Sequence, residues 1–112
     1  MKISILLSTL ALLISHSAFA GMGSGICVEA ALKSRVETNV ASAINSCRQV
    51  QSEGQAYCVA GALNSGAERV VMFAINTCQN VFNVNQGRCV AGAMESRAEQ
   101  NLMFAINSCS MI

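Results

Sequence analysis

The cysteines of this 112-residue chain recur at a fixed period, and no other feature constrains the fold as strongly. They form two series with a spacing of 31 residues, Cys27, Cys58 and Cys89, and Cys47, Cys78 and Cys109. The three cysteine-bounded segments align without a gap, and nine of their 21 positions are identical in all three. A gap-free period of this length is typical of tandem structural repeats. We therefore predict three copies of one unit, over 27–57, 58–88 and 89–112.

The first twenty residues have the organisation of an export signal. Lys2 gives a positive start, residues 3–14 are almost wholly apolar, and Ala18-Phe19-Ala20 has the small-x-small pattern that a signal peptidase reads. The apolar stretch is too short to span a bilayer, which takes roughly twenty residues. We expect cleavage after Ala20, a single small domain over 21–112, and an exported protein of the bacterial periplasm or the extracellular space, where cysteines pair.

Each cysteine-bounded segment favours helix, because it lacks proline and is rich in Ala, Leu, Met, Glu and Arg. Its first and last apolar positions lie on two helical faces displaced by roughly 140°, which predicts a helix, a turn and a second helix. Near the displacement stands Ser-x-x-Glu, which we interpret as a capping box that begins the second helix. These predicted caps are Ser34 and Glu37, Ser65 and Glu68, and Ser96 and Glu99.

The predicted fold is therefore all-α, with three tandem 31-residue α-hairpins stapled by disulfides. The alternative is an up-down three-helix bundle with one long helix per repeat. Two cysteines separated along one straight helix would lie about 30 Å apart, so the bundle would pair cysteines of neighbouring repeats and leave Cys27 and Cys109 unpaired. We favour bonds within each repeat, because duplication of a unit whose two cysteines bond to each other leaves no cysteine unpaired. These bonds are Cys27–Cys47, Cys58–Cys78 and Cys89–Cys109.

Two further pairs of equivalent residues carry expectations. Gly54 is in register with Asn85, and because Gly and Asn best accept a left-handed backbone, we expect a helix C-cap or turn there. Gly66 is expected to ease the turn of the second segment. Phe73 and Phe104 also share a register position, off the main apolar stripe, and we expect them to pack between neighbouring repeats.

The chemical inventory argues against an enzyme. Without Lys2, the chain has six basic and six acidic residues, so it offers no electrostatic attraction to nucleic acid. The only histidine, His16, lies in the predicted signal, which leaves no imidazole for catalysis or metal binding. The nearest cysteines are 11 residues apart, unlike the close pairs of zinc sites. We expect no catalytic residue, no metal and no cofactor.

These exclusions predict a non-catalytic binding or structural module, because helical repeats build extended surfaces. Its partner is an unknown protein or a second copy of the chain. The alternative is a small secreted toxin or membrane-active antimicrobial protein, which small size and disulfides also suit. Such agents are usually cationic, whereas this chain is neutral after loss of the signal.

Overall fold

A computed structural model describes residues 23–112, and this part of the chain contains six helices and no strand. The all-α prediction is confirmed for these residues. The predicted signal, residues 1–20, lies outside them. A first helix over residues 23–33 is followed by five more, α2 (Val40–Cys47), α3 (Glu53–Asn64), α4 (Val71–Thr77), α5 (Val84–Glu95) and α6 (Leu102–Cys109).

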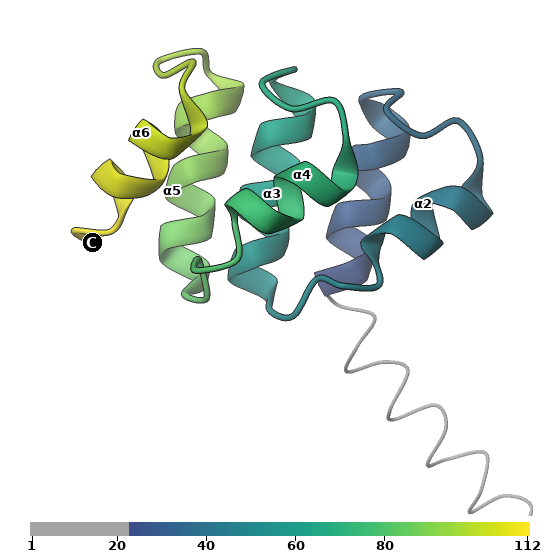
Figure 1. The fold of residues 1–112 in the computed structure, drawn as a ribbon. Helices are drawn as coiled ribbons and strands as arrows, with labels where there is room; N and C mark the ends of the chain where they lie inside the picture. The colour runs from purple at the N-terminus through teal and green to yellow at the C-terminus, as the bar shows by residue number, and fades with distance from the viewer. Residues whose placement is uncertain (1–22) are drawn as a thin grey trace, which may run out of the picture.

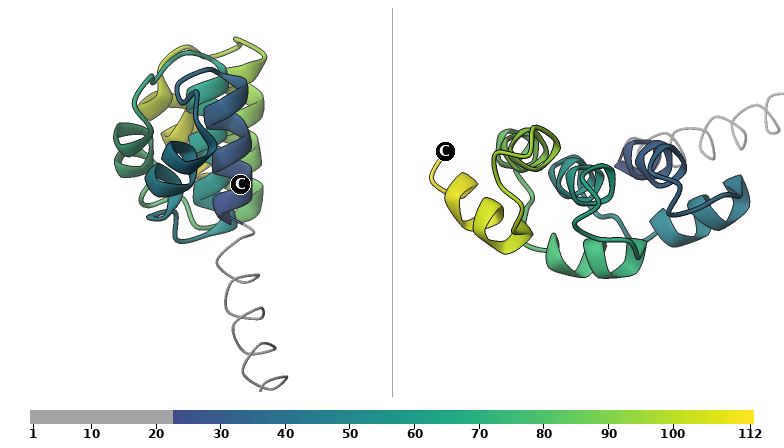
Figure 2. Two further views of the ribbon diagram at one scale, coloured as in Figure 1. Left: turned by 90° about the vertical axis from the view of Figure 1, so that its right-hand side faces the viewer. Right: turned by 90° about the horizontal axis from the view of Figure 1, so that it is seen from above.

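The six helices form two layers (Figure 1). The helix of residues 23–33, α3 and α5 lie side by side in the first layer, and the shorter α2, α4 and α6 form the second (Figure 2). The view from above shows that the layers curve, with the second layer on the outer, convex side (Figure 2, right). Helix α3 packs on α5 within the first layer and α2 on α4 within the second, and contacts of α3 with α4 and of α5 with α6 join the two layers.

Each of the three disulfides joins a first-layer helix to the end of the second-layer helix that follows it. The bonds are Cys27–Cys47, Cys58–Cys78 and Cys89–Cys109, with Cα atoms 5.8 to 5.9 Å apart. The single-long-helix alternative is wrong, because α3 ends at Asn64 and α4 begins only at Val71. Disulfides are thus confirmed, with the pairing expected of a unit that bonds internally.

The predicted capping boxes are wrong, because the three serines lie at helix C-termini. Ser65 is the C-cap of α3, and its hydroxyl donates to the Ala62 carbonyl (3.2 Å) and accepts from the Ala67 N–H (3.3 Å). Ser34 and Ser96 make the same two kinds of contact. The backbone N–H groups of Glu37, Glu68 and Glu99 donate to carbonyls of the preceding helix. The Ser-x-x-Glu pattern therefore closes one helix and does not open the next.

A left-handed residue follows each of these serines and turns the chain away from the first layer. Arg35, Gly66 and Arg97 have φ values of 63°, 79° and 64°. This backbone is easiest for glycine and disfavoured for arginine. Gly66 therefore serves the turn as expected.

Helices α3 and α5 approach closely because glycines stand at their contact. A Cβ atom built on Gly61 would lie 2.6 Å from the Cα of Ala91, and one on Gly87 would collide with the backbone of Gly54. Gly54 itself lies against the backbone of Phe82 and Asn83. The expectation of a turn at Gly54 and Asn85 is wrong, because both residues lie in the first turns of helices. At Gly54, glycine is required by packing.

Three side-chain contacts extend the α3 packing. Asn64 Nδ2 donates to Glu95 Oε1 (2.8 Å), and the Arg88 guanidinium lies 5.1 Å from the Tyr57 ring centre. The hydrogen bond that Arg88 donates to the Tyr57 hydroxyl (3.4 Å) raises the pKa of the guanidinium. Buried Gln55 donates to the Ile75 carbonyl (3.1 Å) and so fastens α3 to α4. The core beneath these contacts is made of small and medium apolar residues and the disulfides.

Substitution of Gly61 by alanine should destabilise the protein, and the same change at Gly92 should not. Gly92 is one period later than Gly61, in the interior of α5, and a Cβ built there meets nothing within 4 Å. We expect Gly61→Ala to lower the free energy of unfolding by about 1–3 kcal/mol through overpacking. Gly92→Ala should raise it by about 1 kcal/mol, since alanine is the better helix former. Denaturant unfolding without reductant, at low protein concentration, measures both. Equal effects of the two changes would contradict the close approach.

Removal of the central disulfide should cost a large part of the stability. The Cys58→Ser, Cys78→Ser double variant opens a loop with a sequence separation of 20. We expect the free energy of unfolding to fall by about 3 kcal/mol, because the unfolded chain gains the entropy of the open loop. Peptide mapping of the unreduced protein should show the remaining Cys27–Cys47 and Cys89–Cys109 links. A Cys47–Cys58 peptide from the wild-type chain would contradict the structure.

Candidate functional site

The second layer presents an uncharged face to solvent, which we call the convex face and define as the exposed residues of α2, α4 and α6 together with Val70. The sequences of these helices, VASAINSC, VMFAINT and LMFAINSC, contain no charged residue. All charged side chains of residues 23–112 belong to the first layer or to the connecting segments. They are Glu29, Lys33, Arg35, Glu37, Arg48, Glu53, Glu68, Arg69, Arg88, Glu95, Arg97 and Glu99.

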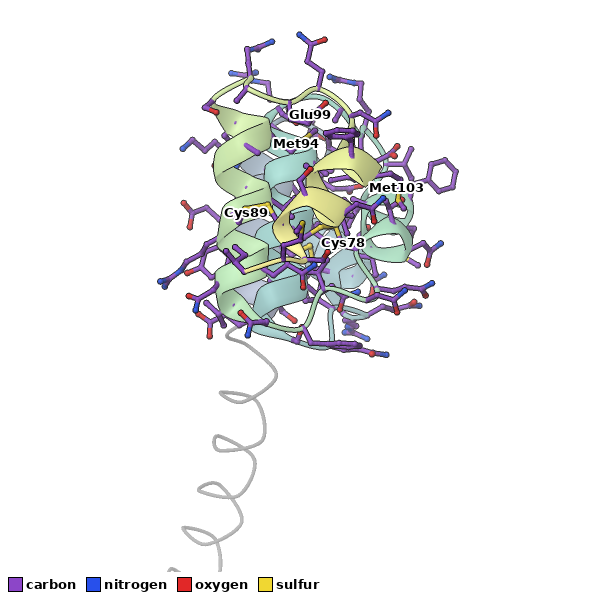
Figure 3. The ribbon with its side chains drawn as sticks, turned by 90° about the vertical axis from the view of Figure 1, so that its left-hand side faces the viewer. Cys78, Cys89, Met94, Glu99 and Met103 are labelled. Carbon is purple, nitrogen blue, oxygen red and sulfur yellow. A yellow bond between two sulfur atoms is a disulfide. The ribbon has the colours of Figure 1, made fainter. Side chains whose placement is uncertain are left out.

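Large apolar side chains project from the convex face. Phe73 in α4 is 58% exposed and Phe104 in α6 is 61% exposed. Met103 projects from the outer side of α6, whereas Met94 of α5 is buried (Figure 3). Val40 and Ile44 of α2 are also exposed. The expectation that the two phenylalanines pack between neighbouring units is wrong, because both side chains lie in solvent.

The local sequence explains why these side chains point outward. Each short helix buries its alanine and isoleucine or cysteine positions against the first layer, such as Ala74 and Ile75 in α4 and Ala105 and Ile106 in α6. The phenylalanine immediately precedes the buried alanine, about 100° away on the helix, and so points to the side. Exposed asparagines, Asn76 and Asn107, follow the buried pair. The convex face is therefore apolar and amide-bearing.

The N-termini of α2, α4 and α6 differ in one residue that the sequence reasoning missed. Asn39 and Asn101 are N-caps whose side-chain oxygens accept the N–H groups of Ser42 (3.2 Å) and Phe104 (2.9 Å). The equivalent N-cap of α4 is Val70, which makes no side-chain capping bond and is 44% exposed. Valine is among the poorest N-cap residues. The N-cap of α4 is thus an exposed apolar residue, three residues before Phe73, at a position where asparagine would stabilise the helix better.

The predicted cysteine sites serve the fold. All six cysteines are bonded, and five are buried, with Cys89 partly exposed. Over residues 23–112, no group of three or more His, Cys, Asp or Glu side chains is placed to hold a metal ion. Within the same range, no buried side-chain nitrogen or oxygen lacks a hydrogen-bond partner. Among these helices, none has the length and apolar character needed to cross a membrane.

Comparison with known proteins adds no assignment. No protein-family model matches the chain, and no curated protein or solved structure resembles it significantly.

Replacement of Val70 by asparagine should stabilise the protein. The new side chain can accept the N–H of Phe73, as Asn39 and Asn101 do for α2 and α6. We expect Val70→Asn to raise the free energy of unfolding by about 1 kcal/mol, and Asn101→Ala to lower it by a similar amount. Thermal or denaturant unfolding of the oxidised variants gives both values. A loss of stability in Val70→Asn would mean that Val70 contributes packing that its exposure conceals.

Proposed function

We propose that this chain is an exported, non-catalytic protein-binding module built from three α-hairpin repeats, each stapled by its own disulfide. The 31-residue sequence period and the three bonds, one per unit, support the repeat organisation. The export signal predicted in residues 1–20 and the disulfides support an oxidising location, the periplasm or the extracellular space. The binding surface is the convex face.

The observation that carries the proposal is the exposure of Phe73 and Phe104 on a face without charge. Single exposed apolar residues are ordinary, but a group on charge-free helices marks an interaction site. Aromatic side chains and methionine are enriched in protein interfaces, and charged residues are depleted from their centres. Phe73, Met103 and Phe104 have this composition. The partner surface is therefore apolar and uncharged at its centre.

Val70 gives a second line of support. The Phe73 N–H donates to the Val70 carbonyl (3.1 Å), whereas the equivalent N–H groups of α2 and α6 donate to asparagine side chains. An asparagine side chain at this N-cap would be the better acceptor, so valine costs up to about 1 kcal/mol of helix stability. Functional surfaces commonly retain such locally unfavourable residues. We interpret Val70 as part of the contact area around Phe73.

The membrane-active alternative has weaker support from the same surface. Helices that bind in a bilayer interface carry Lys or Arg beside their apolar face. Helices α2, α4 and α6 carry neither. A protein partner therefore fits the convex face better than a lipid surface.

The proposal is tested by capture from the native exported fraction with the oxidised protein as bait. We expect one or a few proteins to be retained, and the Phe73→Ser, Phe104→Ser double variant to lose them with its helix content intact. Truncation of two central aromatic contacts should weaken binding by about 2 kcal/mol or more, roughly thirtyfold. Phe82→Ser is the matched control, because Phe82 is 60% exposed but lies outside α2, α4 and α6.

Val70→Asn separates binding from stability, since it should weaken capture while it stabilises the fold. Retention that Phe82→Ser reduces as strongly as the double variant would contradict the convex face as the site. Absence of any retained protein would contradict the binding function itself. Leakage of lipid vesicles caused by the wild-type protein would favour the membrane-active alternative.

A further inference from the structure

The first-layer helices carry a row of exposed residues related by the 31-residue period. Lys33, Asn64 and Glu95 line one hollow of about 340 Å³, together with Glu29 and Ala91. Within this row, Asn64 and Glu95 are joined by a hydrogen bond of 2.8 Å. Asn64 therefore lies beside the residue one period later in the next first-layer helix, and Lys33 lines the same hollow one period earlier.

The row has opposite charges at its two ends. Suppose that a second copy continues the row one period beyond α5. Lys33 of the second copy would then lie beside Glu95 of the first, in the position that Glu95 has relative to Asn64 within one molecule. A hydrogen bond inside the molecule would become an ion pair between molecules. Both side chains are exposed in the single chain.

A second charge pair follows from the same geometry. Gly61 packs on Ala91, so Gly92 would pack on Glu29 of the second copy. Arg88, which precedes Gly92 by one helical turn, would then lie beside that glutamate. The exposed face of α5 thus carries Arg88 and Glu95. On the helix of residues 23–33 of the second copy, Arg88 would face Glu29 and Glu95 would face Lys33. Such complementarity selects a partner and its orientation.

The two faces also keep the space that close packing needs. Gly92 and Gly25 are the counterparts of Gly61 and Gly87, which make the close approach of α3 and α5. A Cβ built on either Gly92 or Gly25 meets nothing within 4 Å. At Gly92, in the interior of α5, glycine costs about 1 kcal/mol relative to alanine, and no contact within the single molecule requires glycine there or at Gly25.

An apolar contact is open on the same side. Val50 and Val81, one period apart, are 9% and 0% exposed, whereas the next member of this series, Ile112, is 72% exposed. Burial of Ile112 would add hydrophobic stabilisation to the charge pairs.

We propose that the processed chain associates head to tail with a second copy of itself. The face of α5 with Arg88, Gly92 and Glu95 packs on the face of residues 23–33 with Gly25, Glu29 and Lys33. This inference rests on the repeat organisation of the proposed function and not on the convex face. A head-to-tail contact is heterologous, so repeated addition builds an open chain of molecules, or a ring where the rotation per copy closes.

Sedimentation velocity of the processed, oxidised protein over a concentration series tests the association. We expect the mean sedimentation coefficient to rise with concentration below about 1 mM, the range in which weak specific contacts form. Added salt should shift the rise to higher concentration, because it screens the ion pairs. A single monomer peak at every concentration would overturn the proposal.

A charge swap tests the interface itself. Lys33→Glu and Glu95→Lys should each weaken association by about fivefold or more, since each replaces an attraction by a repulsion. The double variant should recover most of the wild-type affinity, which a merely structural effect of either change would not produce. Arg69→Glu is the control, an exposed charge reversal outside both faces, and should leave association unchanged.

Failure of the double variant to recover would overturn the pairing of Lys33 with Glu95. The Phe73→Ser, Phe104→Ser variant should associate as the wild type does, because its changes lie on the convex face. Loss of partner capture without loss of self-association, or the reverse, therefore shows which of the two proposals has failed.

Discussion

The three disulfides are the constraint on which the rest of the structure depends. Helices α2, α4 and α6 have seven or eight residues each, well below the roughly 12–15 at which an isolated helix is even marginally stable in water. Cys47 and Cys109 end α2 and α6, and Cys78 caps α4. Each bond therefore ties a short helix by its C-terminal end to a first-layer helix. The bonds hold these helices in place where packing and propensity alone would not.

Because the disulfides hold the short helices in place, the core does not need large side chains to do so, and it is built from small residues. Ala56, Ala62, Ala74 and Ala105 are buried beside medium-sized Val59 and Leu63. Small side chains bring backbones close, and the contacts of Gly61 with Ala91 and of Gly87 with Gly54 are the extreme case. A core of this kind buries little apolar area per residue, and domains of this size commonly rely on covalent staples for that reason.

The sequence predicted the disulfides and the helical class well, because cysteine spacing and the absence of proline act directly on the chain. It failed at helix ends. Ser-x-x-Glu opens a helix when the serine hydroxyl meets free N–H groups, yet Ser65 sits after the last turn of α3 and bonds the Ala62 carbonyl. The true start of α6 was signalled by Asn101, but Val70 breaks that pattern in α4. Local chemistry alone could not tell a C-cap serine from an N-cap serine.

The solvent exposure of side chains was predicted less well than the pairing of the cysteines. A helical wheel places Phe73 and Phe104 at the edge of the apolar stripe, and only the curvature of the layers decides whether an edge residue meets a neighbour. The convex side spreads α4 and α6 apart, so both phenylalanines reach solvent (Figure 2). Gly54 likewise gave no local sign of its role, because its neighbours Phe82 and Asn83 are distant in sequence.

The two proposed surfaces lie on different sides of the molecule and can act together. Stacking through α5 and the helix of residues 23–33 would use the ends of the first layer and leave α4 of every copy exposed. Each added copy would then lengthen the convex face and multiply its Phe73 and Phe104 contacts. Linked weak sites bind a multivalent partner far more tightly than any single site does, without a new contact. The restriction of charge to the first layer and connecting segments suits this arrangement, because the ends select the orientation of a second copy while the convex face stays apolar.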